Sequence, residues 1–287
     1  MKMKRLSILL LGLTSLTGAA QAQTQATLQA TQEGVFSAST PDIEVQLVLG
    51  PEVDGARTAT ISVLEGGASV FQTERPDLFS IFFGPIVHVV EMDGANDVPE
   101  VFISTYTGGA HCCNEVVVLS KNGDSWRSVD FGYFDGDPEG LYPADLNGDG
   151  QAEIKTYDNR FLYTFASYAG SYAPIQILGF KDGDVTDLTA ESDFEWQVRA
   201  GLDEMGTMPE GGEVRNSWLA AQAAYLLTLG EADPLANAID AHDATVDWGM
   251  IRCTVPEVDY SCPEGKSENI GFEAALTEFL TETGYLR

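Results

Sequence analysis

The chain is poor in basic residues and in histidine. It has 15 Lys and Arg against 44 Asp and Glu, with only 3 His, which gives a formal net charge of −29 at pH 7. A surface this acidic repels nucleic acid and anionic lipid, so we expect neither as a partner. Two interpretations of the charge stay open: solubility alone, or a surface that gathers Ca²⁺ or a basic protein partner.

Long apolar runs are also scarce. One, LSILLLGLTSL, follows a basic start and is too short to span a bilayer comfortably. The A-x-A sequence Ala20-Gln21-Ala22 comes after it, so residues 1–22 are predicted to be a signal peptide cleaved after Ala22. Its removal takes three positive charges and leaves a net charge of −32. We therefore expect a periplasmic or secreted protein without a membrane span.

Only four cysteines are present. Cys253 and Cys262 bracket TVPEVDYS, and in an oxidising compartment this spacing predicts a disulfide. Cys112 and Cys113 are adjacent, and three interpretations stay open for them. They form a vicinal disulfide, they are two small structural side chains, or they bind a soft metal such as Zn²⁺ or Cu⁺, or react as thiols, with His111.

The turn TGGAHCC (107–113) is the predicted ligand-facing surface. Two glycines allow a close approach, and a vicinal disulfide would strain the backbone, which is frequent at binding sites. Its residues are Gly108, Gly109, His111, Cys112 and Cys113. The sequence has no G-x-S-x-G, H-E-x-x-H or phosphate-binding glycine motif. A periplasmic hydrolase or oxidoreductase that uses this turn is therefore only the alternative to a binding function.

The chain divides near residue 190. Residues 23–190 read as strands joined by tight turns, with hairpins expected about Gly66-Gly67, Asn122-Gly123 and Asp182-Gly183. Residues 191–287 show helical periodicity over 193–205, 216–230, 233–242 and 271–286. The fold class is thus α+β, with antiparallel β units and then a small helical region. We expect the helices to pack on the β region, although one helix pair resembles a helical-repeat unit.

An acidic loop occurs twice with similar surroundings. Asp93 precedes Asp145 by 52 residues, and Glu100 precedes Glu153 by 53. Each loop leads into a strand, a connection and a hairpin. A period of this size is typical of propeller blades or stacked β units. Three such units fit the length, so either a small or incomplete propeller or an open β arrangement is expected.

The second loop, DLNGDGQAEI (145–154), predicts a calcium site. Oxygen side chains alternate along it, and Gly150 permits the sharp turn that such loops need. It is not an EF-hand, because Thr156 stands where the bidentate glutamate is required and a strand follows. The predicted ligands are Asp145, Asn147, Asp149, Gln151 through its carbonyl, and Glu153.

This loop resembles those of the FG-GAP and VCBS family, whose D-x-D-G-D-G-x-x-D/E motif precedes a strand in each blade of exported β-propeller proteins. Asp145, Asn147, Asp149 and Glu153 match it position by position, with Asn in place of the second Asp. The resemblance covers residues 90–190 and implies blade-like units held by structural Ca²⁺. Together these features predict an exported, calcium-stabilised β-repeat protein. It would act as a binding or envelope-associated module for an unknown protein or glycan ligand, or as an interaction partner of a cationic protein.

Overall fold

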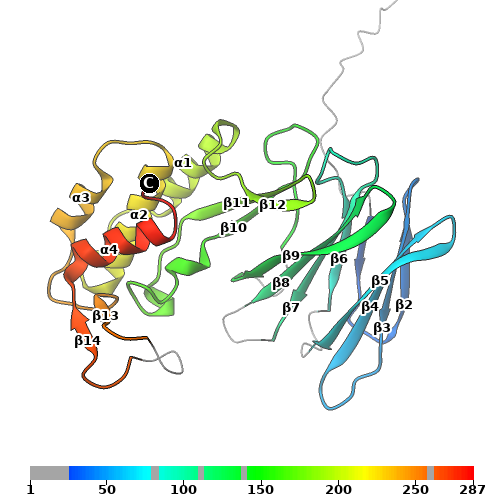
Figure 1. Cartoon of the computed structure of the whole chain (residues 1–287), viewed down its shortest axis with the longest axis horizontal. Coiled ribbons are helices and arrows are strands. Elements are labelled where there is room, and N and C mark those ends of the chain that lie inside the picture. The colour runs from blue at the N-terminus through cyan, green and yellow to red at the C-terminus, as the bar shows by residue number, and fades with distance from the viewer. Residues whose placement is uncertain (1–25, 79–83, 109–112, 137–140, 257–261) are drawn as a thin grey trace, which may run out of the picture.

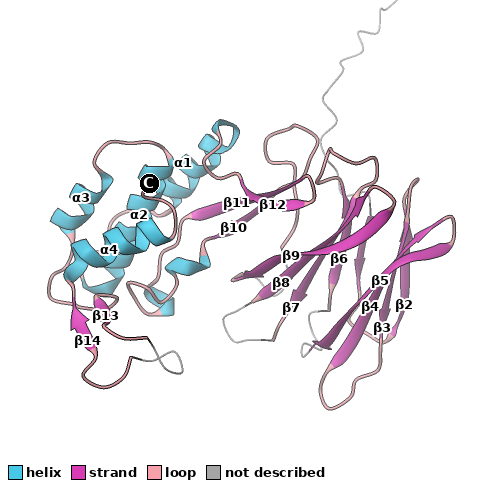
Figure 2. Cartoon of the chain, viewed as in Figure 1, coloured by secondary structure: helices cyan, strands magenta, loops and turns pink. Residues whose placement is uncertain are grey.

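The computed structural model describes residues 26–78, 84–108, 113–136, 141–256 and 262–287. Three antiparallel sheets follow one another along the long axis of the molecule, and helices lie at the far end (Figure 1, Figure 2). The mixed α+β class with a C-terminal helical region agrees with the prediction from the sequence. No helix in this described part is both long and apolar enough to cross a membrane.

The first sheet is a four-stranded meander at one end of the molecule. Its order is β2 (Gly34–Ser39), β3 (Glu44–Leu49), β4 (Arg57–Glu65) and β5 (Ala68–Leu78). Gly66 and Gly67 both have positive φ, 58° and 82°, so the tight turn between β4 and β5 forms where glycine permits it. Buried and partly buried residues alternate along β3, as expected of a strand with one face on a core.

The second sheet has five strands and lies in the middle. Its order is β1 (Ala26–Gln29), β6 (Ile86–Val90), β7 (Glu100–Tyr106), β8 (Asn114–Asn122) and β9 (Ser125–Phe134). All five residues of β6 are buried. The run IVHVV is apolar at every position except His88, rather than alternating, because neighbouring layers cover both faces of this strand.

Two apolar cores on opposite faces of the central sheet explain this burial. Val87 and Val89 pack with Leu47 and Ile61 of the first sheet. Val90 faces the other way and belongs to a core that includes Ile154 from the third sheet. Because successive side chains of a strand point to opposite faces, one apolar strand joins two layers.

The third sheet is short and joins the β region to the helices. It consists of β10 (Ile154–Tyr157), β11 (Ile175–Lys181) and β12 (Asp184–Asp187). Asp182 and Gly183 form the turn between β11 and β12, with φ of 52° and 79°, as the Asp-Gly pair predicts. Between β10 and β11 the chain forms two 3₁₀ turns, η1 (Asn159–Phe161) and η2 (Tyr168–Gly170).

The helical region begins with η3 (Ser192–Phe194) and contains four α-helices within the described residues. They are α1 (Glu195–Glu204), α2 (Gly212–Thr228), α3 (Pro234–Ala241) and α4 (Gly271–Glu282), and the two-stranded ribbon β13 (Ile251–Cys253) and β14 (Ser267–Asn269) precedes α4. Val198 and Tyr225 pack against Ile175 and Ile177 of β11. The helices therefore pack on the β region, as expected for a pair that cannot bury itself.

Two expectations differ from the structure. The turn between β8 and β9 consists of Gly123 and Asp124, not Asn122-Gly123, because Asn122 still pairs with Ser125. The strands described here also form no closed ring of blades; the sheets are stacked in a row. The period of 52 residues did not determine this arrangement, because β1 completes the central sheet by pairing with β6, about sixty residues away in sequence.

Candidate functional site

The predicted calcium ligands lie in one loop that closes on its own backbone amides. Asp145 accepts hydrogen bonds from the N–H groups of Gly148 at 2.7 Å, Asp149 at 3.2 Å and Gly150 at 3.1 Å. Asn147 Oδ1 accepts from Asp149 N at 2.9 Å. These Asx-type bonds explain why Asp, Asn and Gly alternate here, since they replace the backbone pairing that a loop lacks.

The remaining predicted ligands are also engaged within or beside this loop. Asp149 accepts from Gln151 N at 2.7 Å, and Glu153 accepts from Leu146 N at 2.8 Å. Burial, together with the charges of Asp149 and Asp145, raises the pKa of Glu153 to about 7. In the described residues, no three His, Cys, Asp or Glu side chains are gathered so as to hold a metal ion. The side chains of the loop are thus bonded to its own backbone amides, and calcium binding stays a prediction.

The two acidic loops lie side by side. Ala152 N donates to the Glu91 carbonyl oxygen at 2.8 Å, and Gly94 N donates to the side-chain oxygen of Gln151 at 3.0 Å. A cavity of about 430 Å³ opens between them and the β11–β12 hairpin, and Asp93, Asp149, Glu153 and Asp182 are among its lining residues. Gln151 thus contributes its side chain to the junction between the loops.

Carboxylates of the first loop hold the fold together. Glu100 is fully buried and accepts four hydrogen bonds, from Met92 N, Asp93 N, Asn96 Nδ2 and Ser120 Oγ, at 2.8–3.0 Å. Asp93 accepts from Gly183 N at 2.7 Å and from Asp182 N at 3.2 Å. This aspartate therefore joins the central sheet to the turn of the third sheet, and a structural role accounts for both groups.

The predicted ligand-facing turn is only partly described. Gly109, His111 and Cys112 lie outside the described residues. At its base, Thr107 N donates to the Cys113 carbonyl oxygen at 2.9 Å, and Cys113 N donates to Thr107 Oγ1 at 3.0 Å. Cys113 is disulfide-bonded. Gly108 has a φ of 85°, a conformation that glycine adopts at little cost. Ligand binding by this turn stays a prediction.

A disulfide joins Cys253 and Cys262, whose Cα atoms are 5.5 Å apart. It closes the chain that leads from β13 towards β14, far from the acidic loops in the fold (Figure 1). Cys253 itself pairs with Ser267 across the ribbon. This part of the chain is therefore held by a disulfide and by the backbone pairing of β13 with β14 rather than by a large apolar core.

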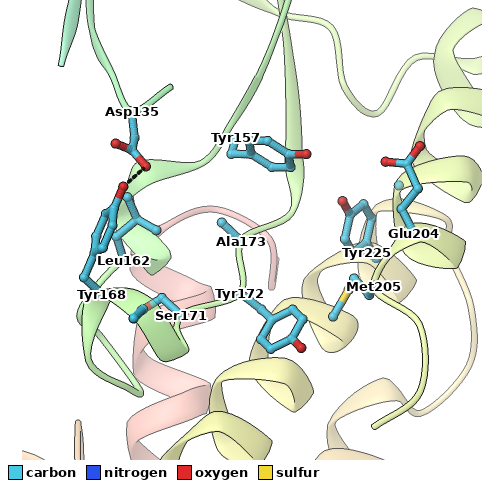
Figure 3. A pocket seen from close by; sticks show the side chains of 12 residues that line it. Asp135, Tyr157, Leu162, Tyr168, Ser171, Tyr172, Ala173, Glu204, Met205 and Tyr225 are labelled. Carbon is cyan, nitrogen blue, oxygen red and sulfur yellow. Dashed lines mark hydrogen bonds between the residues drawn. The ribbon is translucent and has the colours of Figure 1, made fainter. Parts of the chain in front are cut away.

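A pocket lined by tyrosines lies where the β region meets the helices (Figure 3). Its volume is about 440 Å³. Four tyrosines line it: Tyr157 at the end of β10, Tyr168 in η2, Tyr172 shortly after η2, and Tyr225 in α2. Asp135, which follows β9, and Glu204, at the end of α1, line it as well. The fold therefore brings together side chains from five separate segments, with several ring faces and a few polar groups.

Specific contacts position these side chains. Tyr168 Oη donates to Asp135 Oδ2 at 2.7 Å, the dashed line in Figure 3, and this hydrogen bond raises the pKa of Tyr168 to about 12. Tyr225 Oη accepts from Ile175 N at 2.9 Å. A Cβ on Gly201 would lie 2.6 Å from the Tyr225 hydroxyl oxygen, so glycine allows α1 to approach α2 here. The pocket is thus shaped by buried packing on its helical side.

Sequence reasoning missed this pocket, although one signal was present. Four of the ten tyrosines fall within residues 157–172, in a segment that is neither a clear strand nor a clear helix. A cluster of amphipathic rings in a connection is typical of a binding surface. The contributions of Asp135, Glu204 and Tyr225 carry no such signal, because they come from distant positions.

In comparisons with known proteins, a family model matches the helical region. Residues 197–284 match the model of a family described as the sll0997 C-terminal domain. The chain is 40% identical over 210 residues to the "Probable thylakoid lumen protein sll0997" of Synechocystis sp., which covers 70% of this chain and 60% of that protein. It is 33% identical over 211 residues to the "Uncharacterized protein y4bJ" of Sinorhizobium fredii, covering 70% of this chain and 32% of that protein.

The chain thus spans less than two thirds of the length of either relative. No solved structure matches it. The predicted resemblance of residues 90–190 to FG-GAP and VCBS repeats is therefore wrong. The matching family model is the sll0997 C-terminal domain, and the relative from Synechocystis is named as a probable thylakoid lumen protein, not as an FG-GAP or VCBS repeat protein. The physical reason lies in the loop itself. Alternating Asp, Asn and Gly serve any loop that closes on its own amides, so the motif does not specify one family.

Proposed function

We propose that this protein is an exported binding protein whose tyrosine pocket takes up a small organic molecule. The observation that carries the proposal is the pocket itself, about 440 Å³ in volume and lined by tyrosine rings, small and apolar side chains, and two carboxylates. Small-molecule sites in proteins have volumes of roughly 300–1,000 Å³ and mainly apolar or aromatic linings. The pocket lies between two parts of the fold, where such sites are frequent.

Export is supported by the sequence and by a relative. Residues 1–22 have the basic start, the short apolar stretch and the small-residue cleavage site of a signal peptide. One relative is named as a probable thylakoid lumen protein, a location that lies across a membrane from the site of synthesis. The disulfide between Cys253 and Cys262 fits an oxidising compartment. We therefore propose a periplasmic or secreted location for this chain.

Binding fits the pocket better than catalysis. Its described lining offers tyrosine hydroxyls, the Ser171 hydroxyl and two carboxylates, of which Asp135 already accepts from Tyr168, and it holds no His, Cys or Lys beside them to complete a nucleophile–base pair. At the turn 107–113, Cys113 is disulfide-bonded and therefore offers no thiolate. The enzyme alternative thus has weaker support than a binding role.

A thermal-shift screen tests the proposal. The protein without residues 1–22 is mixed with a panel of small neutral, anionic and cationic organic compounds. A compound present at 100 times its Kd stabilises the folded state by about 2.7 kcal/mol, which raises the melting temperature by several degrees. We expect at least one compound class to do so.

Pocket variants decide whether the stabilisation arises at this site. Ala173→Phe fills the pocket and Tyr157→Ala removes one ring, so both should abolish the rise. Tyr133→Ala is the matched control, because Tyr133 is 56% exposed, close to the 51% of Tyr157, and does not line the pocket. A panel without any stabilising compound, or a rise that survives Ala173→Phe, would refute the proposal.

A further inference from the structure

We infer that the tyrosine pocket selects organic cations, molecules that carry an ammonium group, over neutral or anionic molecules of the same shape. The inference rests on the proposed function and names the ligand class for that site. Three properties of the described lining lead to it: carboxylates without an ion-pair partner, the absence of basic side chains, and ring faces.

Two carboxylates give the pocket its negative charge. In Figure 3, Asp135 lies at one end and Glu204 at the other, with the tyrosines between them. Neither carboxylate belongs to any ion pair found among the described residues. No Lys, Arg or His is among the described residues that line the pocket. The negative charge at both ends is therefore not balanced from within the lining.

Asp135 is the more constrained of the two carboxylates. Its Oδ2 accepts from the Tyr168 hydroxyl at 2.7 Å, while Oδ1 is buried and has no hydrogen-bond partner among the described residues. The Tyr168 phenol stays neutral and donates, because the bond to Asp135 raises the pKa of Tyr168 to about 12. A neutral donor orients the carboxylate without cancelling its charge. Asp135 as a whole is half-buried, but its Oδ1 atom is shielded from water without a compensating charge, so a cationic ligand nearby would relieve the cost of that desolvation.

Tyrosine rings supply the second attraction. The face of an aromatic ring carries partial negative charge and attracts an ammonium group within about 6 Å. Tyr168 packs near Tyr163, with ring centroids 5.6 Å apart and planes tilted by 36°, so its orientation is supported from one side. Tyr157, Tyr172 and Tyr225 add further rings around the same space (Figure 3). Rings combined with separated carboxylates suit the apolar body and the charge of an organic cation.

Other ligand classes fit the pocket less well. A hard metal ion needs six or more oxygens close together, and here two carboxylates lie at opposite ends among rings. An anion would meet unbalanced carboxylates and a chain whose formal net charge is −29. A neutral molecule would leave the carboxylates without a counter-charge. Of these classes, only an organic cation would interact favourably with both the carboxylates and the tyrosine rings.

A pair of probes with the same shape tests the selectivity. Acetylcholine carries a quaternary ammonium, and 3,3-dimethylbutyl acetate has a carbon in place of the nitrogen. Isothermal titration calorimetry on the protein without residues 1–22 should show a roughly tenfold higher affinity for the cation. This preference should decrease at high salt, because ions screen the carboxylates. Equal affinity for the two probes would overturn the inference and leave the proposed function standing.

Charge-neutralising variants locate the effect. Glu204→Gln and Asp135→Asn should each lower the affinity for acetylcholine much more than the affinity for 3,3-dimethylbutyl acetate, and so remove most of the preference. Asp203→Asn is the matched control, because Asp203 is the exposed neighbour of Glu204 on α1 and does not line the pocket. Glu204 is exposed, so its variant should fold even if Asp135→Asn does not.

The outcomes separate the two proposals. A preference that survives Glu204→Gln, or that Asp203→Asn removes equally, overturns the inference. If neither probe binds but the screen finds a neutral ligand sensitive to Ala173→Phe, the cation inference fails and the binding function holds. If neither probe binds and the screen finds no ligand, both fail.

Discussion

Tyr225 Oη accepts a hydrogen bond from the backbone N–H of Ile175 at 2.9 Å. Both residues are buried, and the bond joins α2 to the first residue of β11. The helical region is therefore tied to the β region by a polar contact within an apolar core that includes Val198 and Ile177. Such a contact fixes one relative position of two elements, because a buried N–H without a partner is costly.

Tyr225→Phe removes this hydrogen bond and leaves the Ile175 N–H buried without a partner. We expect the free energy of unfolding to fall by about 1–3 kcal/mol, as measured by urea denaturation. Tyr157→Phe is the control, because Tyr157 is half exposed. If both variants are equally stable, the bond does not couple the two regions.

Loss of the disulfide should destabilise the C-terminal part. Cys253 and Cys262 are nine residues apart in sequence. In the chain-entropy model, closing a loop of this length lowers the entropy of the unfolded chain and so raises its free energy by about 2–3 kcal/mol. The double variant Cys253→Ser/Cys262→Ser should lose that amount, and dithiothreitol should have no further effect at this loop. An unchanged unfolding midpoint would show that the loop is already ordered without the bond.

Stability should depend on pH through Glu91. Burial, with the nearby charge of Glu100, raises the pKa of Glu91 from 4.5 to about 7, and within the described part of the chain its buried Oε1 has no hydrogen-bond partner. The folded protein therefore holds this proton more tightly than the unfolded chain does. The stabilisation is fully present below pH 4.5 and is lost as the pH rises to about 7.

Glu91→Gln keeps this position neutral at every pH. At pH 8 the variant should be more stable than the parent by roughly 1 kcal/mol, after allowance for solvent screening, or about 2–4 °C in melting temperature. At pH 4.5 the difference should be small. Glu33→Gln, at an exposed position, should show neither effect. A variant that is destabilised at pH 8 would contradict the assignment.

Calcium binding by the loop 145–153 is tested by melting with and without Ca²⁺. If Asp145, Asp149 and Glu153 gather around an ion, their mutual repulsion is relieved, and Ca²⁺ at 100 times its Kd should stabilise the protein by about 2.7 kcal/mol. Asp149→Ala should remove the rise, and Asp184→Ala, at an exposed position outside the loop, should not. A melting temperature unchanged by Ca²⁺ would refute the site.

Local signals in the sequence correctly predicted several elements. The turns at Gly66-Gly67 and Asp182-Gly183 form because glycine and aspartate accept the positive φ that a tight hairpin requires. The helix over 216–230 corresponds to α2, where apolar residues repeat at helical spacing. Each of these features depends on residues close together in the chain.

The arrangement of the sheets was not predictable in the same way. The recurring acidic loops indicated blades, but Asp93 holds the turn at Gly183 and Glu100 holds its own loop. Similar residues at similar spacing therefore serve loop closure and layer packing. The sequence pattern alone cannot distinguish these roles from metal binding, because both need carboxylates near backbone amides.

By itself, the sequence determined the acidic charge, the α+β class, the tight turns and the helices, because these follow from composition and from neighbours a few residues apart. Only the tertiary structure decided that the central sheet is covered on both faces and that β1 pairs with β6. It also decided that Asp135, Tyr168, Glu204 and Tyr225 line one pocket. The physical reason is that contacts between distant segments depend on how layers bury apolar surface, and no local pattern encodes that choice.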